Sequence, residues 1–299
     1  MSPLPFALFK GKIVPIEEAT VSIASHSLQY GSTSFTGMRG LMQHGNVHLF
    51  RLEEHHARME NAMKLMGWDF SLSFEEFKEG IEALIQKNAP EGDFYIRPFV
   101  FTATTALKMD YTPLTFEWAV YLVPFGALFD PNKGLKMKVS PWKKFSGEAI
   151  PTQAKAGGAY LNSCLAHTDA LQNGFDDALM QDQAGNIVEA SAANLLIRVG
   201  ERLISPPRGE ALDGITLQSV IEILQEEGKE VKREEISLEL LEKADEILVL
   251  GTAAQVQFVE SWDHHQLDKR PGELCLFLRK TMQTIQNTHP HWVTRIEQC

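Results

Sequence analysis

The lysine at position 155 has unusual neighbours for a charged residue. It lies in the segment IPTQAKAGGAYLNS (150–163), where alanines and glycines flank it and no other charged side chain occurs. Most lysines simply point into water, and that interpretation applies here as well. A lysine desolvated among small residues would instead favour its neutral amine, which is a nucleophile. Small neighbours would also leave room for a flat ligand, so the segment is compatible with Schiff-base chemistry.

A second candidate is Glu189, in the segment NIVEASAANLL (186–196). It follows an apolar stretch and precedes small residues. A solvated acid at the end of a strand is the simpler interpretation. The alternative is a carboxylate that faces a buried cation, such as the protonated nitrogen of a pyridine ring, where it would preserve an electron sink.

Two short turns and one arginine have the chemistry of an anion site. Residues 213–216 (DGIT) open a predicted helix, and residues 251–253 (GTA) follow a predicted strand. Each offers backbone N–H groups and a threonine hydroxyl, although such turns are commonly plain caps. Arg51 lies in the first turn of another predicted helix, where its charge opposes the helix dipole. That misfit favours a specific role over the alternative of an exposed surface residue.

The segment DFYIRPFVFT (93–102) predicts a strand with an arginine among aromatic residues. Alternation places Tyr95, Arg97, Phe99 and Phe101 on one face. A guanidinium above an apolar wall can bind a carboxylate through two hydrogen bonds. The competing interpretation is an arginine of an edge strand that reaches into solvent.

The surrounding pattern predicts the elements that hold these residues. The first half contains hairpins over 6–15 and 41–50, helices over 51–67 and 73–85, and strands over 93–102 and 116–123. The second half contains strands over 135–140, 178–181, 186–188 and 246–250, with a turn between the second and third, and helices over 158–173, 216–227 and 273–287. We therefore expect a small α+β domain over 1–125, a connector over 126–134, and a larger domain over 135–299 with a β-rich barrel or sheet and helices.

Composition excludes several classes of function. The 299 residues have a formal net charge of −11, which disfavours binding to nucleic acid. The three cysteines are odd in number and form no CxxC pair, so we expect neither disulfides nor a metal site. No secretion signal is recognisable, and the longest apolar run (119–129) contains Pro124 and is too short to span a bilayer. These features favour a cytoplasmic protein without a membrane partner.

Taken together, the segments resemble one family, the fold-type IV pyridoxal-phosphate aminotransferases, and most closely the branched-chain amino-acid aminotransferases. The resemblance covers nearly the whole chain, and its parts occur in the family's order. They are YGSTSFTGMRG (30–40), HLFRLEEH (48–55), YIRP (95–98), AKAGGAYLNS (154–163), EASAANL (189–195), DGIT (213–216) and GTAA (251–254).

This resemblance implies a two-domain fold and assigns roles. Lys155 would bind pyridoxal 5′-phosphate covalently and act as general base and acid, and Glu189 would bind the pyridine nitrogen. Tyr160 would hydrogen-bond the ring hydroxyl oxygen. The phosphate would be held by Arg51, Gly214, Ile215, Thr216 and Thr252. The substrate pocket would be shaped by Tyr30, Phe35, Tyr95, Arg97 and Ala253.

The implied reaction transfers the amino group of leucine, isoleucine or valine to 2-oxoglutarate, giving 2-oxo acids and L-glutamate. Related enzymes complete the pocket with a partner subunit, so the resemblance implies at least a homodimer. The chain departs from the family pattern at Thr36, where glutamate is usual, at Asp213, where proline is usual, at Leu128 and in the segment 102–113. Thr36 keeps an amine transaminase as an alternative, beside a D-amino-acid aminotransferase and an aminodeoxychorismate lyase. A non-catalytic vitamin-B6 carrier on the same fold is a further alternative, which the intact Lys155, Glu189 and Tyr160 disfavour.

Overall fold

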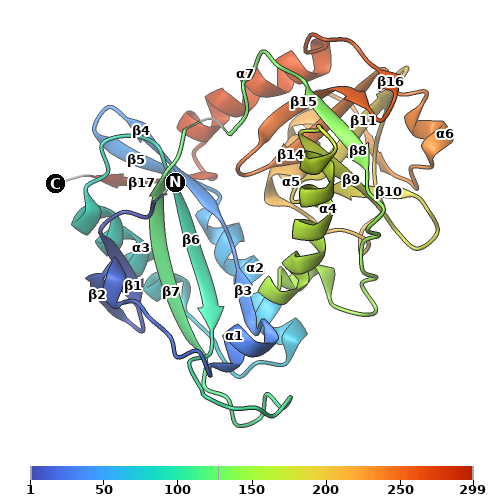
Figure 1. Cartoon of the computed structure of the whole chain (residues 1–299). Coiled ribbons are helices and arrows are strands. Elements are labelled where there is room, and N and C mark those ends of the chain that lie inside the picture. Colours follow the sequence, from blue (N-terminus) through green and yellow to red (C-terminus); the bar gives the residue numbers. More distant parts are fainter. Residues whose placement is uncertain (1, 127, 298–299) are drawn as a thin grey trace. The chain divides into compact units, whose positions relative to one another are not determined.

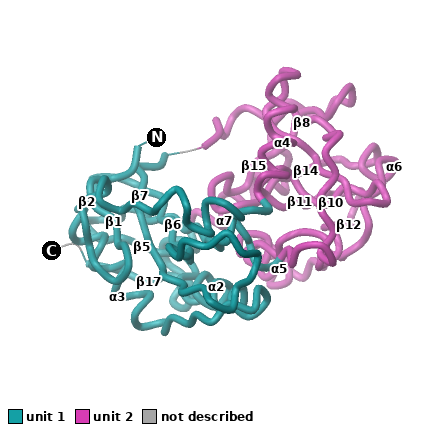
Figure 2. Tube along the Cα trace, turned by 60° about the horizontal axis from the view of Figure 1, so that its bottom comes forward, with its two compact units in different colours: residues 1–126, 153–159, 284–299 teal, residues 127–152, 160–283 magenta. Residues whose placement is uncertain are grey.

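The computed structural model describes residues 2–126 and 128–297, which divide into two compact units (Figure 2). Unit 1 comprises Met1–Gly126, Gln153–Ala159 and Thr284–Cys299, and unit 2 comprises Ala127–Thr152 and Tyr160–Gln283. The segments 153–159 and 284–299 are thus grouped with unit 1, whereas the sequence pattern assigned them to the second domain. Residue 127 of the predicted connector lies outside the described residues.

Unit 1 is built on an eight-stranded sheet with the order β17-β5-β4-β6-β7-β1-β2, and β3 pairs with β6 (Figure 1). All of its strand pairs are antiparallel. The strands are β1 (Phe6–Phe9), β2 (Lys12–Pro15), β3 (Thr33–Phe35), β4 (Met38–Gln43), β5 (Asn46–Phe50), β6 (Phe94–Phe101), β7 (Glu117–Pro124) and β17 (Val293–Glu297). The helices are η1 (Ile16–Glu18), α1 (His26–Tyr30), α2 (Leu52–Met66) and α3 (Phe74–Asn88), with the turns η2 (Thr152–Ala154) and η3 (Gly157–Ala159) further along the chain.

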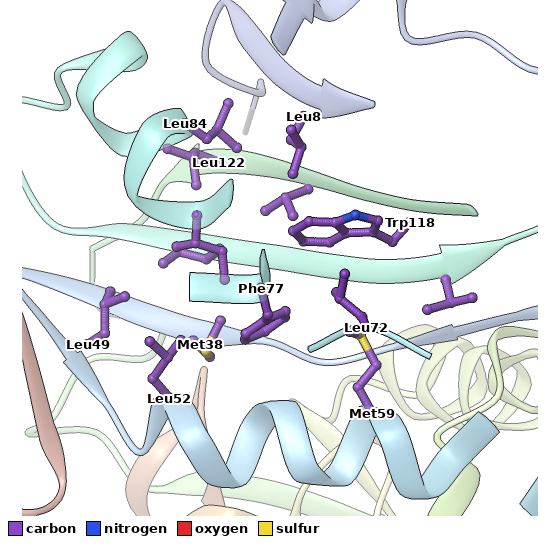
Figure 3. Packing of buried hydrophobic residues seen from close by; sticks show 14 of the residues in the cluster. Leu8, Met38, Leu49, Leu52, Met59, Leu72, Phe77, Leu84, Trp118 and Leu122 are labelled. Atoms are coloured by element: carbon purple, nitrogen blue, oxygen red, sulfur yellow. The ribbon is translucent and has the colours of Figure 1, made fainter. Parts of the chain in front are cut away.

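Helices α2 and α3 bury their apolar sides in the core of unit 1. Figure 3 shows Phe77 of α3 and Met59 of α2 among side chains that include Trp118 of β7. The predicted capping box at the start of α3 is confirmed. The Ser73 hydroxyl accepts from the Glu76 amide at 3.2 Å, and the Glu76 carboxylate accepts from the Ser73 amide at 3.1 Å.

Unit 2 is built on a nine-stranded mixed sheet with the order β10-β9-β8-β15-β14-β11-β12-β13, and β16 pairs with β15. β8 runs parallel to both β9 and β15. The strands are β8 (Leu135–Val139), β9 (Asp177–Gln181), β10 (Ile187–Ala190), β11 (Asn194–Val199), β12 (Arg202–Ser205), β13 (Val231–Arg233), β14 (Glu246–Gly251), β15 (Gln255–Trp262) and β16 (His265–Gln266). The helices are α4 (Tyr160–Gln172), α5 (Ile215–Glu226), α6 (Leu238–Leu241) and α7 (Glu273–Thr288), and the end of α7 belongs to unit 1.

Two contacts orient the helices of unit 2. α4 packs against β9, and α5 packs against β11 and β14. Helix α5 therefore lies against β14, the strand that leads into the turn 251–254 (GTAA). In the part of the chain that the structure describes, no helix combines the length and apolarity that crossing a bilayer requires.

The thiol of Cys275 is expected to resist alkylation. It is fully buried in α7, and burial raises its pKa to about 11, with Arg279 opposing and Glu246 adding to the effect. At pH 8 only about one thiol in a thousand would be ionised, and the thiolate is the reactive form. Iodoacetamide at pH 8 should modify the exposed Cys164 in the native protein and Cys275 only after unfolding in urea, as read by peptide mass spectrometry. Equal native rates at the two cysteines would contradict this expectation.

Candidate active site

The segment that contains Lys155 runs beside β3 in unit 1. The Ser34 hydroxyl donates to the carbonyl of Ala154 at 2.6 Å, and the Phe35 amide donates to the carbonyl of Lys155 at 3.3 Å. The Lys155 backbone has φ 45°, a left-handed conformation that is costly for a residue with a side chain. Its ammonium nitrogen lies 4.9 Å from the centroid of the Phe35 ring. The surrounding contacts thus hold the lysine in a strained conformation, which is typical of functional positions.

The small residues after Lys155 are explained by packing. A Cβ atom at Gly157 would lie 2.0 Å from the Thr33 hydroxyl oxygen, and one at Gly31 would lie 2.6 Å from the Cα atom of Gly158. The glycines therefore allow the segment to approach β3 and α1 closely. The sequence interpretation, in which they leave room for a flat ligand, is not needed to account for these two positions.

Arg97 lies among aromatic rings, as the sequence predicted. Along β6, Phe94 and Ile96 are fully buried, while Tyr95 and Arg97 are half-buried on the other face. The Arg97 guanidinium carbon is 4.5 Å from the centroid of Phe35 and 5.2 Å from that of Tyr95. Its Nε atom is buried and has no hydrogen-bond partner among the described residues. Phe35 thus lies under two cations, Lys155 and Arg97, and a cation so placed can bind a carboxylate.

The hydroxyl of Tyr95 is seated directly against Gly37. A Cβ atom at position 37 would lie 1.6 Å from that oxygen. Any larger residue there would displace the tyrosine. The position of the Tyr95 hydroxyl therefore depends on this glycine of the FTGM segment.

A buried polar chain connects α2 with the residue after β3. Arg58 donates to the Thr36 hydroxyl at 2.5 Å, and that hydroxyl lies 2.7 Å from Nδ1 of His55. Because an arginine only donates, Thr36 accepts from it and donates its own proton to the imidazole. Nδ1 is then the unprotonated nitrogen, which fits the pKa of His55, lowered well below its ordinary value by burial and by the charges of Arg58, Lys155 and Arg51. His55 is therefore neutral at physiological pH.

We expect His55 to make the protein less stable in mild acid. The folded state resists protonation of this imidazole, whereas the unfolded chain binds the proton near pH 6.5. Protonation thus favours the unfolded state, and the contribution of His55 falls by about 1.4 kcal/mol for each pH unit below 6.5, down to the folded pKa. Urea unfolding is measured at pH 7.5 and 5.5. The free energy of unfolding should fall less between these two pH values in His55→Gln than in the wild type. The exposed His44 provides the control, because His44→Gln should leave the loss unchanged.

Arg51 is buried in unit 1, with 3% of its surface exposed, so the alternative of an exposed helix residue is wrong. It occupies the N-cap of α2 with φ 53°, again in the left-handed region. Its guanidinium carbon lies 3.7 Å from the centroid of the Trp292 ring, and Glu54 forms an ion pair with it at 3.5 Å. Stacking and the ion pair hold the cation at the start of a helix, where N–H groups also point outward.

Tyr30 lies at the end of α1 and is directed toward the divergent segment 102–113. Its hydroxyl donates to the carbonyl of Leu107 at 3.1 Å, and 38% of its surface is exposed. His26 of the same helix contacts the carbonyl of Lys108 at 2.9 Å. α1 therefore anchors this segment within unit 1.

In unit 2, Glu189 is a buried residue of β10, with 5% of its surface exposed. The alternative of a solvated strand-end acid is therefore wrong. Its carboxylate forms an ion pair with the buried Lys144. The Lys144 ammonium thus compensates the charge of the Glu189 carboxylate inside the unit. An acid that binds a cationic ligand must keep this charge.

Asn194 connects the turn 213–216 (DGIT) with the strand that leads into the turn 251–254 (GTAA). It follows Glu189 through the turn 190–193 and pairs with Leu250 at the end of β14. Its side chain accepts from the amide of Gly214 at 3.1 Å and donates to the carbonyl of Leu212 at 2.7 Å. The strand end of Glu189, the DGIT turn and the GTAA turn therefore converge on one place in this unit.

The N-terminus of α5 has the features of an anion site. Its N-cap is Gly214, which has no side chain to cap the first amides. Thr216 in the first turn is buried, with 6% of its surface exposed. Asp213, which replaces the family's usual proline, forms ion pairs with Arg233 at 2.7 Å and with Arg208 at 3.3 Å. A helix start with a glycine N-cap and a buried threonine is suited to an anion, and Asp213 beside it faces two arginines.

The remaining predicted residues of unit 2 lie at element ends. Thr252 and Ala253 form the turn between β14 and β15, where the carbonyl of Thr252 accepts from the Gln255 side chain at 2.9 Å. Tyr160 is the first residue of α4 and is half-buried. Ile215 is the first residue of α5. Leu128 has 43% of its surface exposed.

Comparisons with known proteins agree with this geometry. The family model for class IV amino-transferases matches residues 33–262. The chain belongs to the class IV aminotransferases. A probable branched-chain-amino-acid aminotransferase of Aquifex aeolicus is 36% identical over 271 residues, which cover 88% of this chain and 86% of the relative.

Two solved class IV aminotransferase structures are similar over nearly their whole length. The branched-chain aminotransferase of Thermoproteus uzoniensis, crystallised with norvaline, has a TM-score of 0.93 at 30% identity, covering 98% of this chain and 99% of its own. The branched-chain amino acid aminotransferase of Thermobaculum terrenum, in its holo-form with pyridoxal phosphate, has a TM-score of 0.92 at 26% identity, covering 99% of each chain. The predicted fold-type IV architecture is therefore confirmed.

Enzymes of this family use pyridoxal 5′-phosphate, and the residues present fit that group. A helix start with a glycine N-cap and a buried threonine suits a phosphate ester. A buried, charged carboxylate on the adjoining strand end suits a protonated ring nitrogen. A lysine in a strained backbone conformation supplies the amine that such a cofactor needs.

Three charged or titratable residues near the predicted site residues were not identified from the sequence as functional candidates. His55 and Arg58 lie in α2, where they read as ordinary helix residues, and Lys144 lies in the coil after β8. The only local signal was the helical spacing of Arg51, His55 and Arg58, which places them on neighbouring turns. The partner of Lys144 is distant in the sequence and left no local signal.

Proposed function

We propose that the chain is a branched-chain aminotransferase that moves the amino group of leucine, isoleucine or valine to 2-oxoglutarate with pyridoxal 5′-phosphate. The observation that carries the proposal is the convergence at Asn194 of the Glu189 strand end and two anion-binding turns. The names of the relatives support the substrate class, since they are branched-chain aminotransferases.

The roles of the cofactor-binding residues follow from this proposal. The amide of Ile215 and the hydroxyls of Thr216 and Thr252 bind the phosphate, and Arg51 adds a positive charge. Gly214 positions the start of α5 at the phosphate, because its own amide donates to Asn194. Tyr160 hydrogen-bonds the ring hydroxyl oxygen, and Glu189 accepts a hydrogen bond from the ring nitrogen. When bound, the cofactor supplies an aldehyde carbon for the substrate amine and a ring that accepts electrons.

Lys155 performs the proton transfers. Its Nζ atom takes the proton from the α-carbon of the amino acid, which requires the neutral amine, and returns a proton later in the cycle. The left-handed backbone at Lys155 and the contacts of its segment with β3 limit where that nitrogen can lie. Such constraint favours a repeatable geometry for the transfer.

The aromatic residues of unit 1 account for substrates of two kinds. The ring of Phe35 offers apolar surface to an aliphatic side chain, and Arg97 above it offers a guanidinium to a carboxylate of glutamate or 2-oxoglutarate. Tyr95, seated on Gly37, and Tyr30 and Ala253 shape the remainder of the pocket in this proposal. One pocket then serves both half-reactions.

A substrate panel tests the proposed function. Purified protein loaded with pyridoxal 5′-phosphate is assayed with 2-oxoglutarate and, in turn, L-leucine, L-isoleucine, L-valine, D-alanine and a primary amine that lacks a carboxylate. We expect the three branched-chain substrates to have the highest kcat/KM. Turnover only with D-alanine or only with the amine would overturn the substrate assignment. The absence of transamination with every substrate would overturn the proposal that the protein is an aminotransferase.

We also propose that the protein forms at least a homodimer. Supporting it, unit 1 exposes large apolar side chains around α1 and the segment 102–113: Ile23 81%, Leu28 60%, Leu107 78% and Met109 88%. Apolar groups gathered in this way are typical of an interface between subunits. Light scattering should report at least twice the chain mass, and Leu107→Lys with Met109→Lys should lower it. A monomeric wild-type protein would refute the dimer.

We further propose that the enzyme is located in the cytoplasm. The free thiols of Cys164 and Cys275 support a reducing compartment. Fractionation of cells followed by immunoblotting tests the assignment, and recovery outside the cytoplasmic fraction would contradict it.

A further inference from the structure

Unit 2 contains a buried ion pair whose cation has no role so far. Lys144 and Glu189 have 8% and 5% of their surfaces exposed, and the Lys144 ammonium contacts Oε1 of the Glu189 carboxylate. The ammonium also lies 4.6 Å from the centroid of the Phe145 ring. A lysine is rarely buried without a specific partner, and here the partner is the acid assigned to the cofactor ring.

The backbone of Lys144 is fixed by the hairpin that carries Glu189. Its amide donates to the carbonyl of Gln181 in β9 at 2.8 Å, and its carbonyl accepts from the Gln183 side chain at 3.0 Å. β9 pairs antiparallel with β10, where Glu189 lies opposite Met180. The lysine and the glutamate are therefore mounted on one rigid supersecondary element.

A buried ion pair contributes little net stabilisation to a folded protein. Removing two charges from water is costly, and well-packed apolar residues often stabilise a core equally well. A lone buried carboxylate, however, is worse, because nothing then compensates its charge. A cation beside Glu189 is thus required if the acid must stay charged inside the protein.

The carboxylate has two oxygens, and Lys144 contacts Oε1. Oε2 thus stays available to accept a hydrogen bond from another donor. We propose that Lys144 is a positioning residue: its ammonium holds Glu189 charged and fixes its orientation, so that the free oxygen accepts the ring N–H of the bound cofactor. This inference rests on the proposed function, because it needs a cofactor with a protonated ring nitrogen.

The proposal predicts a change in the cofactor itself. Without the ammonium, the proton shared by Glu189 and the ring nitrogen is redistributed, and the electronic state of the ring changes with it. The pH at which the absorption of the bound cofactor titrates should then differ from that of the wild type. A structural ion pair would have no such effect on the spectrum.

The experiment compares four forms of the cofactor-loaded protein: wild type, Lys144→Met, Lys144→Arg and the control Lys143→Met. Lys143 is the adjacent residue, is exposed, and donates to the carbonyl of Gln183 at 2.9 Å, so it shares the loop and the hairpin but not the ion pair. The measurements are the pH titration of the cofactor absorption, the cofactor Kd and kcat. We expect Lys144→Met to shift the titration and to lower kcat on the order of tenfold, as for loss of an orienting partner. Lys144→Arg should largely retain wild-type values, and Lys143→Met should equal the wild type.

The double variant Lys144→Met, Glu189→Gln covers the case in which Lys144→Met alone does not fold, because no charge is then buried alone. If Lys144 acts through Glu189, the double variant should match Glu189→Gln in titration and kcat. A further loss in the double variant, or an unshifted titration and unchanged kcat in folded Lys144→Met, would overturn the proposal. A wild-type protein that binds no pyridoxal phosphate would overturn the proposed function as well, so the two failures are distinguishable.

Discussion

Lys155→Ala is expected to abolish transamination, with kcat lowered by about 10⁴-fold or more, the upper range for loss of a positioned proton-transfer group. Alanine removes both the amine that binds the cofactor and the base that takes the α-proton. The absorption band of the lysine-bound cofactor at about 410 nm should disappear from the loaded protein. Steady-state kinetics with L-leucine and 2-oxoglutarate, together with the spectrum, check both effects.

Two further variants separate the amine from charge and from backbone strain. Lys155→Arg keeps a cation but offers no amine, so it should be as inactive as the alanine variant. Lys10 is also a lysine with a left-handed backbone, φ 51°, and it is exposed in the turn between β1 and β2. Lys10→Ala should retain full activity. A Lys155→Ala protein that keeps both the band and a tenth of the activity would contradict the assignment.

Glu189→Gln is the second change from which we expect a large effect. The amide keeps the shape of the side chain but removes the charge that faces the ring nitrogen, so the ring becomes a weaker electron sink. We expect kcat to fall on the order of 10²–10³-fold, as for the loss of one fixed electrostatic partner. The Kd for pyridoxal 5′-phosphate should change by less than about tenfold, because the phosphate contacts account for much of the binding.

Glu246 provides the matched control for a buried glutamate of the same unit. It has 9% of its surface exposed and accepts from Nε of Arg198 at 3.0 Å and from the amide of Leu274 at 3.4 Å. Glu246→Gln should lower the free energy of unfolding and leave kcat at the wild-type value. If Glu189→Gln weakened cofactor binding and kcat by equal factors, its role would be to bind and not to activate.

Elements that depend on local pattern could be predicted from the sequence. The capping box of Ser73 and Glu76, the hairpin at Gly45-Asn46 and the alternation of β6 each use residues close together in the chain. The structure contains all three: β6 ends within one residue of the expected bounds, and β4 begins three residues before the expected start at 41. Strands β11, β12, β13 and β15, by contrast, were not predicted. β11 (NLLIRV) is largely an apolar run, which does not distinguish a buried strand from other buried segments, and β13 (VKR) has only three residues.

The polar contacts of the site could not be predicted from the sequence. Thr36 was recognised as a departure from the family pattern, but not as the link between Arg58 and His55. Burial of Arg51 against Trp292 requires the pairing of β17 with β5. These contacts join residues far apart in the chain, so neither composition nor spacing could reveal them.

The sequence by itself determined which residues match one aminotransferase family, and in which order: a lysine among small residues, an acid before a small-residue turn, and two turns that contain glycine and threonine. Those signals are local, because each depends on a few neighbouring residues. Only the tertiary structure decided that Gly157 serves packing against β3, that Asn194 joins the turns, and that Lys144 accompanies Glu189. Each of these depends on side chains that meet only after the strands have paired.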